Sequence, residues 1–396
     1  MSSSAKLFEP FTLGDIQLKH RVVMAPMTRL RAGQEDGIPS EWAAEYYSSR
    51  ATEGGLIVTE ASITAPSARV WPFQPGLWSE DQVAGWRKVT DAVHAKGGKI
   101  IAQIAAAGRV AVPGFSPIIY APSNVHDPTP GAPQPELTVM TEEDIARNVI
   151  EHTEAAKNAI KAGFDGVEIH VANGYLLDQF VQSVSNHRTD AYGGSISNRI
   201  RFPLQIVRSV SAAIGPSKTG LRISPFGTFQ GMREPSILNE QGFEISGPVT
   251  TFSTFLEAVY QEVPDFGYIH AVEPRVSGAE DQSTDKINAK DTLQPFREVV
   301  EKHDGKLLVA GGYNAVSARE HAEKYDDLVV IGRYFTSNPD LIHRIKNDLP
   351  IVKYDRNTFY TQGKEGYLGW PTYDQQAAIA GTAQVKVEAA TVQVAA

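Results

Sequence analysis

The sequence predicts a single-domain α/β protein whose chain closes into a (β/α)8 TIM barrel, and three observations support this prediction. Eight short runs rich in β-branched and other apolar residues lie between residues 22 and 347. Each run is almost continuously apolar, as expected of a strand that is buried on both faces. Amphipathic stretches separate the runs, and strands that alternate with helices form parallel sheets. The count of eight favours a closed barrel over an open doubly wound sheet, which is the structural alternative.

The expected strands are short runs that end in turn residues. They cover residues 22–27, 55–63, 99–105, 166–171, 219–225, 267–274, 306–313 and 328–335. A barrel of this kind carries its reacting groups at the carboxyl ends of its strands. The residues at these ends are therefore the first candidates for a functional site.

The clearest helix signals are two capping boxes. Ser79 begins the sequence Ser-Glu-Asp-Gln, Thr141 begins Thr-Glu-Glu-Asp, and apolar residues follow each at helical spacing. Gly163 is placed to end the second of these helices. Later helices are expected at 198–214, 252–263, 315–325 and 339–347, the first of which contains a proline that is best tolerated near its first turn.

The segments outside this alternation also have expected places. Residues 8–22 alternate around Leu13-Gly14-Asp15 and predict a small hairpin at the bottom of the barrel. Two long loops, 112–137 and 275–288, each follow a strand and are expected at the catalytic mouth. The barrel domain is expected to span residues 1–375, and the Ala-, Val- and Gln-rich tail of residues 376–396 to be flexible.

Composition excludes several classes of protein. The 396 residues are 42% hydrophobic and 21% charged, which is ordinary for a globular protein and argues against intrinsic disorder. The 37 basic and 46 acidic residues include no run of Lys or Arg, so nucleic acid is not an expected partner. The absence of cysteine excludes disulfides, thiolate metal sites, iron–sulfur clusters and a cysteine nucleophile. No apolar stretch has the length of a signal-peptide core or a membrane span, so a soluble, cytoplasmic protein is expected.

Several motifs of common enzyme classes are missing from the sequence. It contains no Gly-x-Gly-x-x-Gly, P-loop, His-Glu-x-x-His or Gly-x-Ser-x-Gly. Its ten histidines do not cluster at metal-ligand spacing, so no metal site is expected. Nucleotide hydrolysis, serine hydrolysis and metal-assisted hydrolysis are therefore disfavoured, and the chemistry has to be read from the strand ends.

The end of the fourth expected strand carries a long and specific motif. Residues 170–180 read His-x-Ala-Asn-Gly-Tyr-Leu-Leu-x-Gln-Phe, and 185–195 read Ser-Asn-x-Arg-Thr-Asp-x-Tyr-Gly-Gly-Ser. Together they resemble the old yellow enzyme family of FMN-dependent ene-reductases. Residues 25–29, 332–335 and 354–360 match the same family, in its fungal branch. The resemblance covers roughly residues 7 to 375 and implies non-covalent FMN at the barrel mouth.

The resemblance implies a phosphate site at the last two strands. Gly311, Gly312 and Gly332 allow close backbone approach and offer N–H donors, and Arg333 adds a charged fork that matches a phosphate dianion. Sites of this kind after strands seven and eight recur in the fold. Tight-turn glycines with a structural arginine are the alternative interpretation.

The resemblance also implies contacts with the flavin ring. The Gln103 amide can match the alternating donors and acceptors of the pyrimidine edge. Arg222 can stabilise the anionic reduced flavin, and Thr28 can donate to the C4 oxygen. Taken singly, these residues could instead be a buried amide, a strand-end ion pair and a turn hydroxyl. The complete set of expected ring contacts is Pro26, Met27, Thr28, Ala61, Gln103 and Arg222.

The remaining candidates concern the reaction. His170 and Asn173 could donate to one substrate carbonyl oxygen, polarise the conjugated C=C bond and stabilise the developing enolate. After hydride transfer from flavin N5, Tyr175 could protonate the α-carbon, because a phenol is protonated at neutral pH. A satisfied histidine and an anchoring aromatic are the structural alternatives. Trp71 and Tyr360 fall where family members line the substrate pocket.

Ala105 departs from the family pattern. Many relatives carry a bulky aromatic two residues after the glutamine, where this chain has Ala105. A smaller side chain should widen the pocket or let a loop move inward, which predicts tolerance of bulkier enones.

The resulting prediction is an NADPH-oxidising, FMN-dependent reductase of small electron-poor alkenes, acting as a monomer or homodimer. Nothing in the sequence chooses NADPH over NADH, and the natural substrate and stereochemistry stay open. Within the family, isomerisation or reduction of one specialised-metabolite intermediate is an alternative. From other classes, a cofactor-free barrel lyase or isomerase could bind a phosphorylated substrate at Gly311, Gly312 and Arg333, or a binding protein could hold flavin without turnover.

Overall fold

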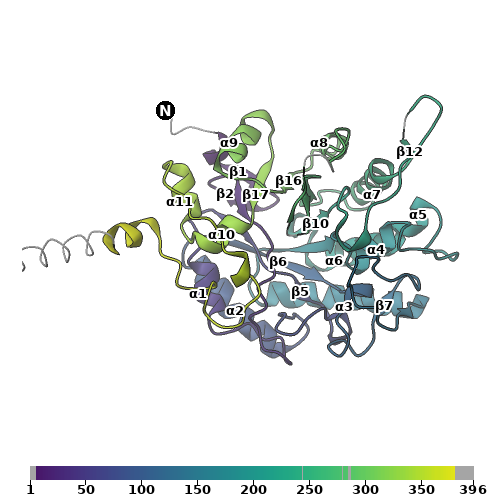
Figure 1. Cartoon of the computed structure of the whole chain (residues 1–396), viewed down its shortest axis with the longest axis horizontal. Helices are drawn as coiled ribbons and strands as arrows, with labels where there is room; N and C mark the ends of the chain where they lie inside the picture. The colour runs from purple at the N-terminus through teal and green to yellow at the C-terminus, as the bar shows by residue number, and fades with distance from the viewer. Residues whose placement is uncertain (1–5, 243, 279, 284–286, 380–396) are drawn as a thin grey trace, which may run out of the picture.

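Eight parallel strands close into a barrel at the centre of the computed structural model (Figure 1), which describes residues 6–242, 244–278, 280–283 and 287–379. The ring closes because β17 pairs with β3, and β4 pairs with both β3 and β6. The predicted (β/α)8 barrel is therefore confirmed. Its strands are β3 (Val22–Met24), β4 (Leu56–Val58) continued by β5 (Ser62–Ile63), β6 (Lys99–Ala105), β9 (Gly166–Val171), β10 (Thr219–Ile223), β13 (Tyr268–Val272), β16 (Leu307–Ala310) and β17 (Leu328–Ile331).

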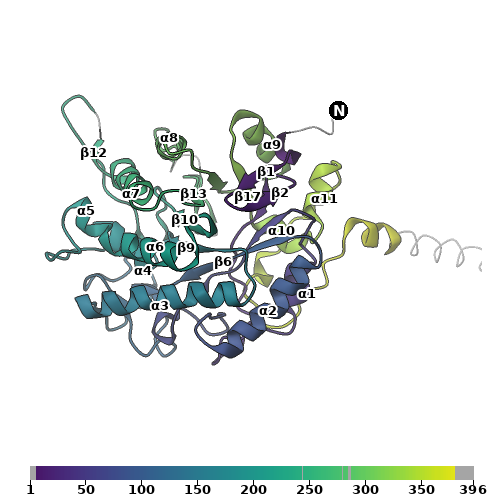
Figure 2. The same cartoon turned by 180° about the vertical axis from the view of Figure 1, so that it is seen from behind.

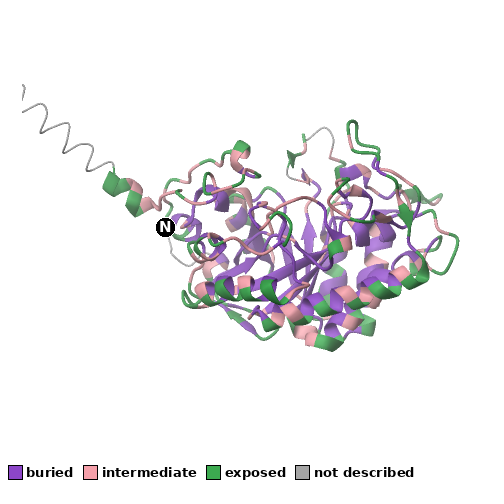
Figure 3. Cartoon of the chain, turned by 90° about the horizontal axis from the view of Figure 1, so that it is seen from below, coloured by how far each residue is buried: buried purple, intermediate pink, exposed green. Residues whose placement is uncertain are grey.

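Helices surround the barrel, with buried inner faces and exposed outer faces (Figures 2 and 3). Both predicted capping boxes form, because the Ser79 hydroxyl accepts the Gln82 N–H and the Thr141 hydroxyl accepts the Asp144 N–H. The helices are α1 (Ala43–Ser48), α2 (Glu80–His94), α3 (Glu142–Lys161), α4 (Leu176–Val181), α5 (Ile196–Arg199), α6 (Arg201–Ile214), α7 (Pro248–Glu262), α8 (Gln294–Lys302), α9 (Ala315–Lys324), α10 (Arg333–Ser337) and α11 (Leu341–Lys346).

The expected second strand, 55–63, is interrupted between β4 and β5. The backbone N–H of Glu60 donates to the hydroxyl of Tyr47 at 3.1 Å rather than to a neighbouring strand. This side chain from α1 diverts the backbone, which the local sequence does not reveal. Ala61, inside the interruption, faces the mouth cavity described below.

Several other boundaries differ from those expected. The expected strand 328–335 ends at Ile331, and α10 begins at Arg333 after a turn at Gly332. The expected helix 198–214 is divided into α5 and α6, with its proline in the first turn of α6. The expected helix 252–263 already begins at Pro248, because proline suits the first helical position. The helix expected at 339–347 is the shorter α11.

The predicted N-terminal hairpin covers the bottom of the barrel. Strands β1 (Phe11–Leu13) and β2 (Ile16–Leu18) pair antiparallel. Their apolar side chains join an interior cluster with Leu56, Leu308 and Leu328 from the barrel strands. A second cluster fills the layer between strands and helices. Because the bottom is closed, the open end lies at the carboxyl ends of the strands.

Loops at the carboxyl ends build the mouth. The predicted loop 112–137 contains β7 (Tyr120–Ala121), which pairs with β8 (Thr138–Val139), and the described part of loop 275–288 forms the hairpin β14 (Val276–Ser277) and β15 (Glu280–Asp281). A third mouth loop was not predicted: it follows β10 and carries β11 (Ile237–Leu238) and β12 (Glu244–Ser246). Figure 1 shows this hairpin projecting from the barrel.

The chain returns to the barrel after α11. Residues 351–372 run back over the mouth and include a turn of 3-10 helix at Arg356–Thr358. Residues 373–379 are helical, and the flexibility expected from residue 376 stays a prediction. The rest of that predicted tail, 380–396, lies outside the described residues. Among the described helices, none combines the length and apolarity needed to cross a lipid bilayer.

Candidate active site

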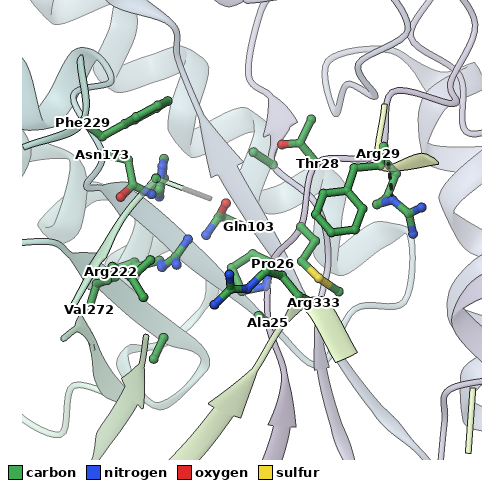
Figure 4. A pocket seen from close by; sticks show the side chains of 18 of the residues that line it. Ala25, Pro26, Thr28, Arg29, Gln103, Asn173, Arg222, Phe229, Val272 and Arg333 are labelled. Carbon is green, nitrogen blue, oxygen red and sulfur yellow. Dashed lines mark hydrogen bonds between the residues drawn. The ribbon is translucent and has the colours of Figure 1, made fainter. Parts of the chain in front are cut away.

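A cavity of about 630 Å³ opens at the carboxyl ends of the barrel strands. Side chains from several strands reach into it, and Figure 4 shows Gln103 and Arg222 extending toward a common space, with Asn173 beside them. Every residue selected from the sequence lines this cavity, namely Pro26, Met27, Thr28, Ala61, Trp71, Gln103, His170, Asn173, Tyr175, Arg222, Gly311, Gly312, Gly332, Arg333 and Tyr360. Ala105 lines it too. The structure therefore brings together groups that span more than three hundred residues of sequence.

A buried carboxylate organises the floor of the cavity. Glu168 accepts hydrogen bonds from the Gln103 amide at 2.7 Å and from the Tyr268 hydroxyl at 3.0 Å, and His270 Nδ1 lies 2.9 Å from it. Burial alone would raise the pKa of Glu168, but attraction to His270 and Arg222 and these hydrogen bonds lower it to about 2. The floor thus holds an ionised carboxylate, which fixes the orientation of Gln103.

Arg222 is the cation of this floor. It lies on β10 in register with His170 on β9. Burial lowers the pKa of Arg222, while the charge of Glu168 acts in the opposite direction. Because an arginine stays protonated in proteins, the charge persists. Its Nε is buried and has no hydrogen-bond partner among the described residues, so this donor is available to a bound group.

His170 and Asn173 mark the exit of β9. Asn173 adopts a left-handed backbone conformation, with φ of 57°, and its N–H donates to the Ser224 hydroxyl at 2.7 Å. The next N–H, of Gly174, donates to the buried carboxyl of Asp178 at 2.8 Å. These bonds turn the chain so that both side chains face the cavity.

The ring of His170 is neutral. Burial lowers the pKa of His170 to about 3, and the positive charge of Arg222 acts in the same direction. Its Nδ1 is buried without a hydrogen-bond partner within the described part of the chain. A neutral imidazole keeps one N–H donor, so His170 can donate one hydrogen bond across the physiological pH range.

Tyr175 lies beside this pair at the start of α4. Its ring centroid is 5.3 Å from that of His170 and 6.3 Å from that of Trp71, which it meets edge-on. Burial raises the pKa of Tyr175 well above its ordinary value. The hydroxyl is therefore protonated and can deliver a proton to a group bound in the cavity.

The opposite end of the cavity forms an anion cradle. Gly311 and Gly312 have φ of 130° and 69°, a region that favours glycine. Arg333 Nη1 donates to the Asp281 carboxylate at 2.8 Å, and Nη2 completes a fork on the same group. A Cβ added at Gly312 would lie 3.3 Å from that carboxylate and 3.8 Å from Arg333 Nη2. A protein carboxylate thus already lies where the sequence predicted a phosphate.

Some features of the site were missed from sequence. Glu168 was not assigned a role, although it lies two residues before His170, and alternate residues of a strand share a face. Phe229, in the unpredicted loop after β10, and Phe359 also line the cavity. No local signal marks these two aromatics, because loops place them there. Within the described residues, no group of three His, Cys, Asp or Glu could hold a metal ion.

Comparison with known proteins now decides the family. Residues 6–351 match the NADH:flavin oxidoreductase / NADH oxidase family. The chain belongs to this family. As an old yellow enzyme relative, it is 40% identical to flavin oxidoreductase hxnT of Emericella nidulans, over 94% of this chain and 98% of that protein. It is 40% identical to chanoclavine-I aldehyde reductase fgaOx3 of Penicillium roqueforti, over 92% and 96%. It is 38% identical to 12-oxophytodienoate reductase 1 of Oryza sativa subsp. japonica, over 94% and 95%.

Solved structures of the old yellow enzyme family are similar across the whole barrel. Morphinone reductase in complex with tetrahydroNAD has a TM-score of 0.81 and 32% identity, covering 93% of this chain and 98% of that one. The old yellow enzyme homologue from Zymomonas mobilis has a TM-score of 0.80 and 34% identity, covering 92% and 99%. The family resemblance seen in the sequence is therefore confirmed, and the chain is an oxidoreductase.

Membership of the old yellow enzyme family implies FMN, and the cavity fits this cofactor. The cradle of Gly312 and Arg333 already accommodates an anionic oxygen pair, as a phosphate requires. The floor offers the Arg222 Nε as a buried donor for a polar ring edge. The residues present therefore match both ends of an FMN molecule.

Proposed function

We propose that this protein is an FMN-dependent, NADPH-oxidising reductase of the activated C=C bond in α,β-unsaturated carbonyl compounds. The observation that carries this proposal is the grouping of three side chains on one part of the cavity: a neutral imidazole (His170), a carboxamide (Asn173) and a protonated phenol (Tyr175). When bound, FMN would accept hydride from the nicotinamide and supply it to the β-carbon of the alkene.

The proposed cofactor contacts follow the two ends of the cavity. Gly311, Gly312, Gly332 and Arg333 would hold the phosphate with backbone N–H groups and a charged fork. At the ring end, Gln103 would match the pyrimidine edge, its orientation fixed by Glu168. The remaining proposed ring contacts are Pro26, Met27, Thr28, Ala61 and Arg222.

The proposed roles of the reacting residues divide into holding charge and moving a proton. His170 and Asn173 would donate to the substrate carbonyl oxygen, which polarises the alkene and stabilises the negative charge that grows on this oxygen; one such donor is typically worth about 2.7–4 kcal/mol of barrier. Tyr175 would then give its hydroxyl proton to the α-carbon. The phenol holds this proton at neutral pH, because the pKa of a tyrosine is about 10 even before burial raises it.

Names of relatives support the substrate class and the reductant. Two relatives are called chanoclavine-I aldehyde reductase and 12-oxophytodienoate reductase, and each of these names includes the name of a carbonyl compound. One similar structure contains tetrahydroNAD. The family resemblance favours NADPH over NADH as the reductant. Trp71 and Tyr360 are the proposed side walls for the substrate. We further propose that the enzyme acts in the cytoplasm, as a monomer or homodimer, on small molecules.

The test separates the two half-reactions of the FMN-loaded protein. Anaerobic NADPH, with NADH in parallel, should bleach the flavin, and an enone should restore its colour. In Tyr175→Phe the bleaching should proceed as in wild type, while reoxidation by the enone slows by about 10²–10⁴-fold, the usual contribution of a general acid. A colourless protein would favour a cofactor-free lyase instead. A coloured protein without reoxidation by any enone would favour a flavin-binding protein without turnover.

A further inference from the structure

Two arginines on the loop after β3 hold a distant part of the chain. Arg29 and Arg31 are buried, with exposures of 1% and 4%. Both guanidinium groups reach the segment of residues 358–366, which we call the wall segment. Arg29 donates to the carbonyl oxygens of Phe359 at 3.1 Å and Gly366 at 2.8 Å. These contacts join positions more than 325 residues apart in the sequence.

Arg31 makes the larger share of these contacts. Its Nε donates to the Gly363 carbonyl at 2.9 Å, Nη1 to the Phe359 carbonyl at 3.1 Å, and Nη2 to the Thr358 and Glu365 carbonyls at 3.1 and 2.8 Å. Nη2 also donates to the Thr361 hydroxyl at 2.7 Å. Hydrogen bonds from a charged donor are stronger than neutral ones. The wall segment has no strand or long helix of its own, so these bonds define its path.

Aromatic rings fix Tyr367, the residue that directly follows the wall segment. Tyr367 stacks on Tyr46 of α1, with centroids 3.9 Å apart and planes 8° from parallel. The guanidinium of Arg29 lies 5.2 Å from the Tyr46 ring and 5.3 Å from the Tyr367 ring. Burial lowers the pKa of Arg31 to about 10, and the charge of Arg29 acts in the same direction. Arg31 is still charged at neutral pH, so its hydrogen bonds to the wall segment are charge-assisted.

The wall segment matters because two of its residues line the cavity. Phe359 and Tyr360 are part of the lining, and Tyr360 is half exposed there. Arg29 belongs to the same loop as Thr28, and Figure 4 shows the two at the edge of the cavity, with the Arg29 guanidinium turned away from Gln103 and Arg222. One loop therefore contributes cavity lining on one side and anchors the wall segment on the other.

We propose that Arg29 and Arg31 are positioning residues that hold the wall segment against the barrel, so that Tyr360 limits the space available to the alkene. The proposal rests on the proposed function in naming an unsaturated carbonyl compound as the occupant of that space. It assigns to Arg31, which does not itself line the cavity, an influence on which substrates bind.

The variant Arg31→Lys tests this, because lysine keeps the charge but loses the planar fork. In the FMN-loaded protein, amide exchange at residues 358–366 should rise by about tenfold, as expected when a held segment opens more often. The KM for a small cyclic enone should rise by about three- to tenfold with little change in kcat, since loss of one or two such bonds weakens binding by about that factor. The rate of flavin bleaching by NADPH should change by less than about twofold, because the fork touches no residue of the proposed cofactor contacts.

Two comparisons make the test specific. Arg344→Lys is the matched control, because Arg344 is fully buried and also binds carbonyls, of Pro350 and Pro371, but away from the cavity. It should leave the KM and the exchange of 358–366 unchanged. In a Tyr360→Ala background, Arg31→Lys should no longer alter the KM, since the ring that it positions is gone.

The outcomes distinguish this inference from the proposed function. Faster exchange at 358–366 with an unchanged enone KM would overturn the positioning role, as would unchanged exchange. If wild-type protein binds FMN but reduces no enone, the proposed function fails, whereas exchange still reports whether Arg31 holds the segment. Should Arg31→Lys not fold, Thr361→Ala removes one acceptor of Arg31 and should move exchange and KM in the same direction by about twofold.

Discussion

The two ends of the cavity hold their charges in opposite ways. At the floor, the Glu168 and His270 side chains are both fully buried, and Gln103 and Tyr268 complete the hydrogen bonds of the carboxylate. At the cradle, Arg333 pairs with Asp281, whose side chain is 58% exposed on the β14–β15 hairpin. The floor is therefore satisfied within the barrel, whereas the cradle relies on a partner from a surface hairpin.

This difference indicates which end of the cavity fixes the geometry of the site and which end can exchange its ionic partner. A buried charge has no water to replace a lost partner, so breaking its hydrogen bonds is costly. An exposed pair is screened and typically contributes only about 0–1 kcal/mol. We expect the floor to set the geometry of the ring site, and the cradle to exchange the Asp281 carboxylate for a phosphate.

Removing the floor carboxylate is expected to have the largest effect. Glu168→Ala leaves the Gln103 amide, the Tyr268 hydroxyl and the His270 imidazole without their common acceptor. Breaking a buried charged group of this kind typically lowers the free energy of unfolding by about 3–5 kcal/mol. Urea unfolding measures this loss. Asp281→Asn is the control from the other end and should cost less than about 1 kcal/mol; equal losses would contradict the contrast.

Removing the cation of the cradle, Arg333, should weaken the binding of the cofactor and leave the stability of the fold almost unchanged. Arg333→Met deletes the forked donor, and hydrogen bonds to charged groups contribute about 1.5–3 kcal/mol, or roughly 10- to 150-fold in Kd. Quenching of flavin fluorescence on titration into the apoprotein gives the Kd. Riboflavin is the matched ligand because it lacks the phosphate. If the variant weakened the binding of riboflavin and of FMN by the same factor, the cradle would not be the phosphate site.

Acid should act on the site through His170, at the exit of β9. With a pKa of about 3 in the folded protein and about 6.5 in the unfolded chain, only the unfolded chain gains this proton as pH falls below 6.5. The histidine thus contributes nothing to the pH dependence of stability above about pH 6.5. Below that pH it lowers the free energy of unfolding, by about 2 kcal/mol at pH 5. Urea unfolding at pH 7 and pH 5 should show that the free energy of unfolding drops by about 2 kcal/mol less in His170→Asn than in the wild type. An identical drop in both proteins would mean that His170 titrates normally.

Other buried groups set the background of that comparison. Burial also lowers the pKa values of His20 and His152 to about 4, so both add to the loss of stability in acid. Burial raises the pKa of Asp178 to about 7, and this carboxyl therefore opposes that loss. Because these groups are unchanged in His170→Asn, the difference between the two proteins isolates the contribution of His170.

Local patterns allowed the barrel and about half of the cavity lining to be predicted. Residues such as His170 and the glycines at 311 and 312 lie near the carboxyl ends of apolar runs, so their place at the mouth follows from the fold. The β11–β12 hairpin and Phe229 could not be found in this way, because their loop has no periodic pattern. The contacts of Arg31 with residues 358–366 could not be found either, since they join the two ends of the chain and depend on how the barrel closes.

The roles of charged neighbours were also beyond the sequence. Arg333 was predicted to face an anion, but its pairing with Asp281 requires the hairpin of β14 and β15 to fold over the cradle. Likewise, the sequence contains Glu168 and His270 a hundred residues apart, and only the pairing of β9, β10 and β13 brings them into one cluster. Register between distant strands supplies information that spacing along one strand lacks.

The smallest predicted effect concerns the exchange of anions at the cradle. If phosphate must replace the Asp281 carboxylate, Asp281→Asn removes both a competitor and a like charge, and FMN should bind about two- to fivefold more tightly, as fits a largely exposed pair. Glu280→Gln is the control on the same hairpin, because Glu280 forms its ion pair with Arg356 and its charge acts less on Arg333 than that of Asp281 does, so its gain should be smaller. Riboflavin affinity should not change, and the gain for FMN should shrink at high salt, which screens exposed charges. Weaker FMN binding in Asp281→Asn would show instead that the carboxylate supports the cradle, and the two ends of the cavity would then be more alike than their exposure suggests.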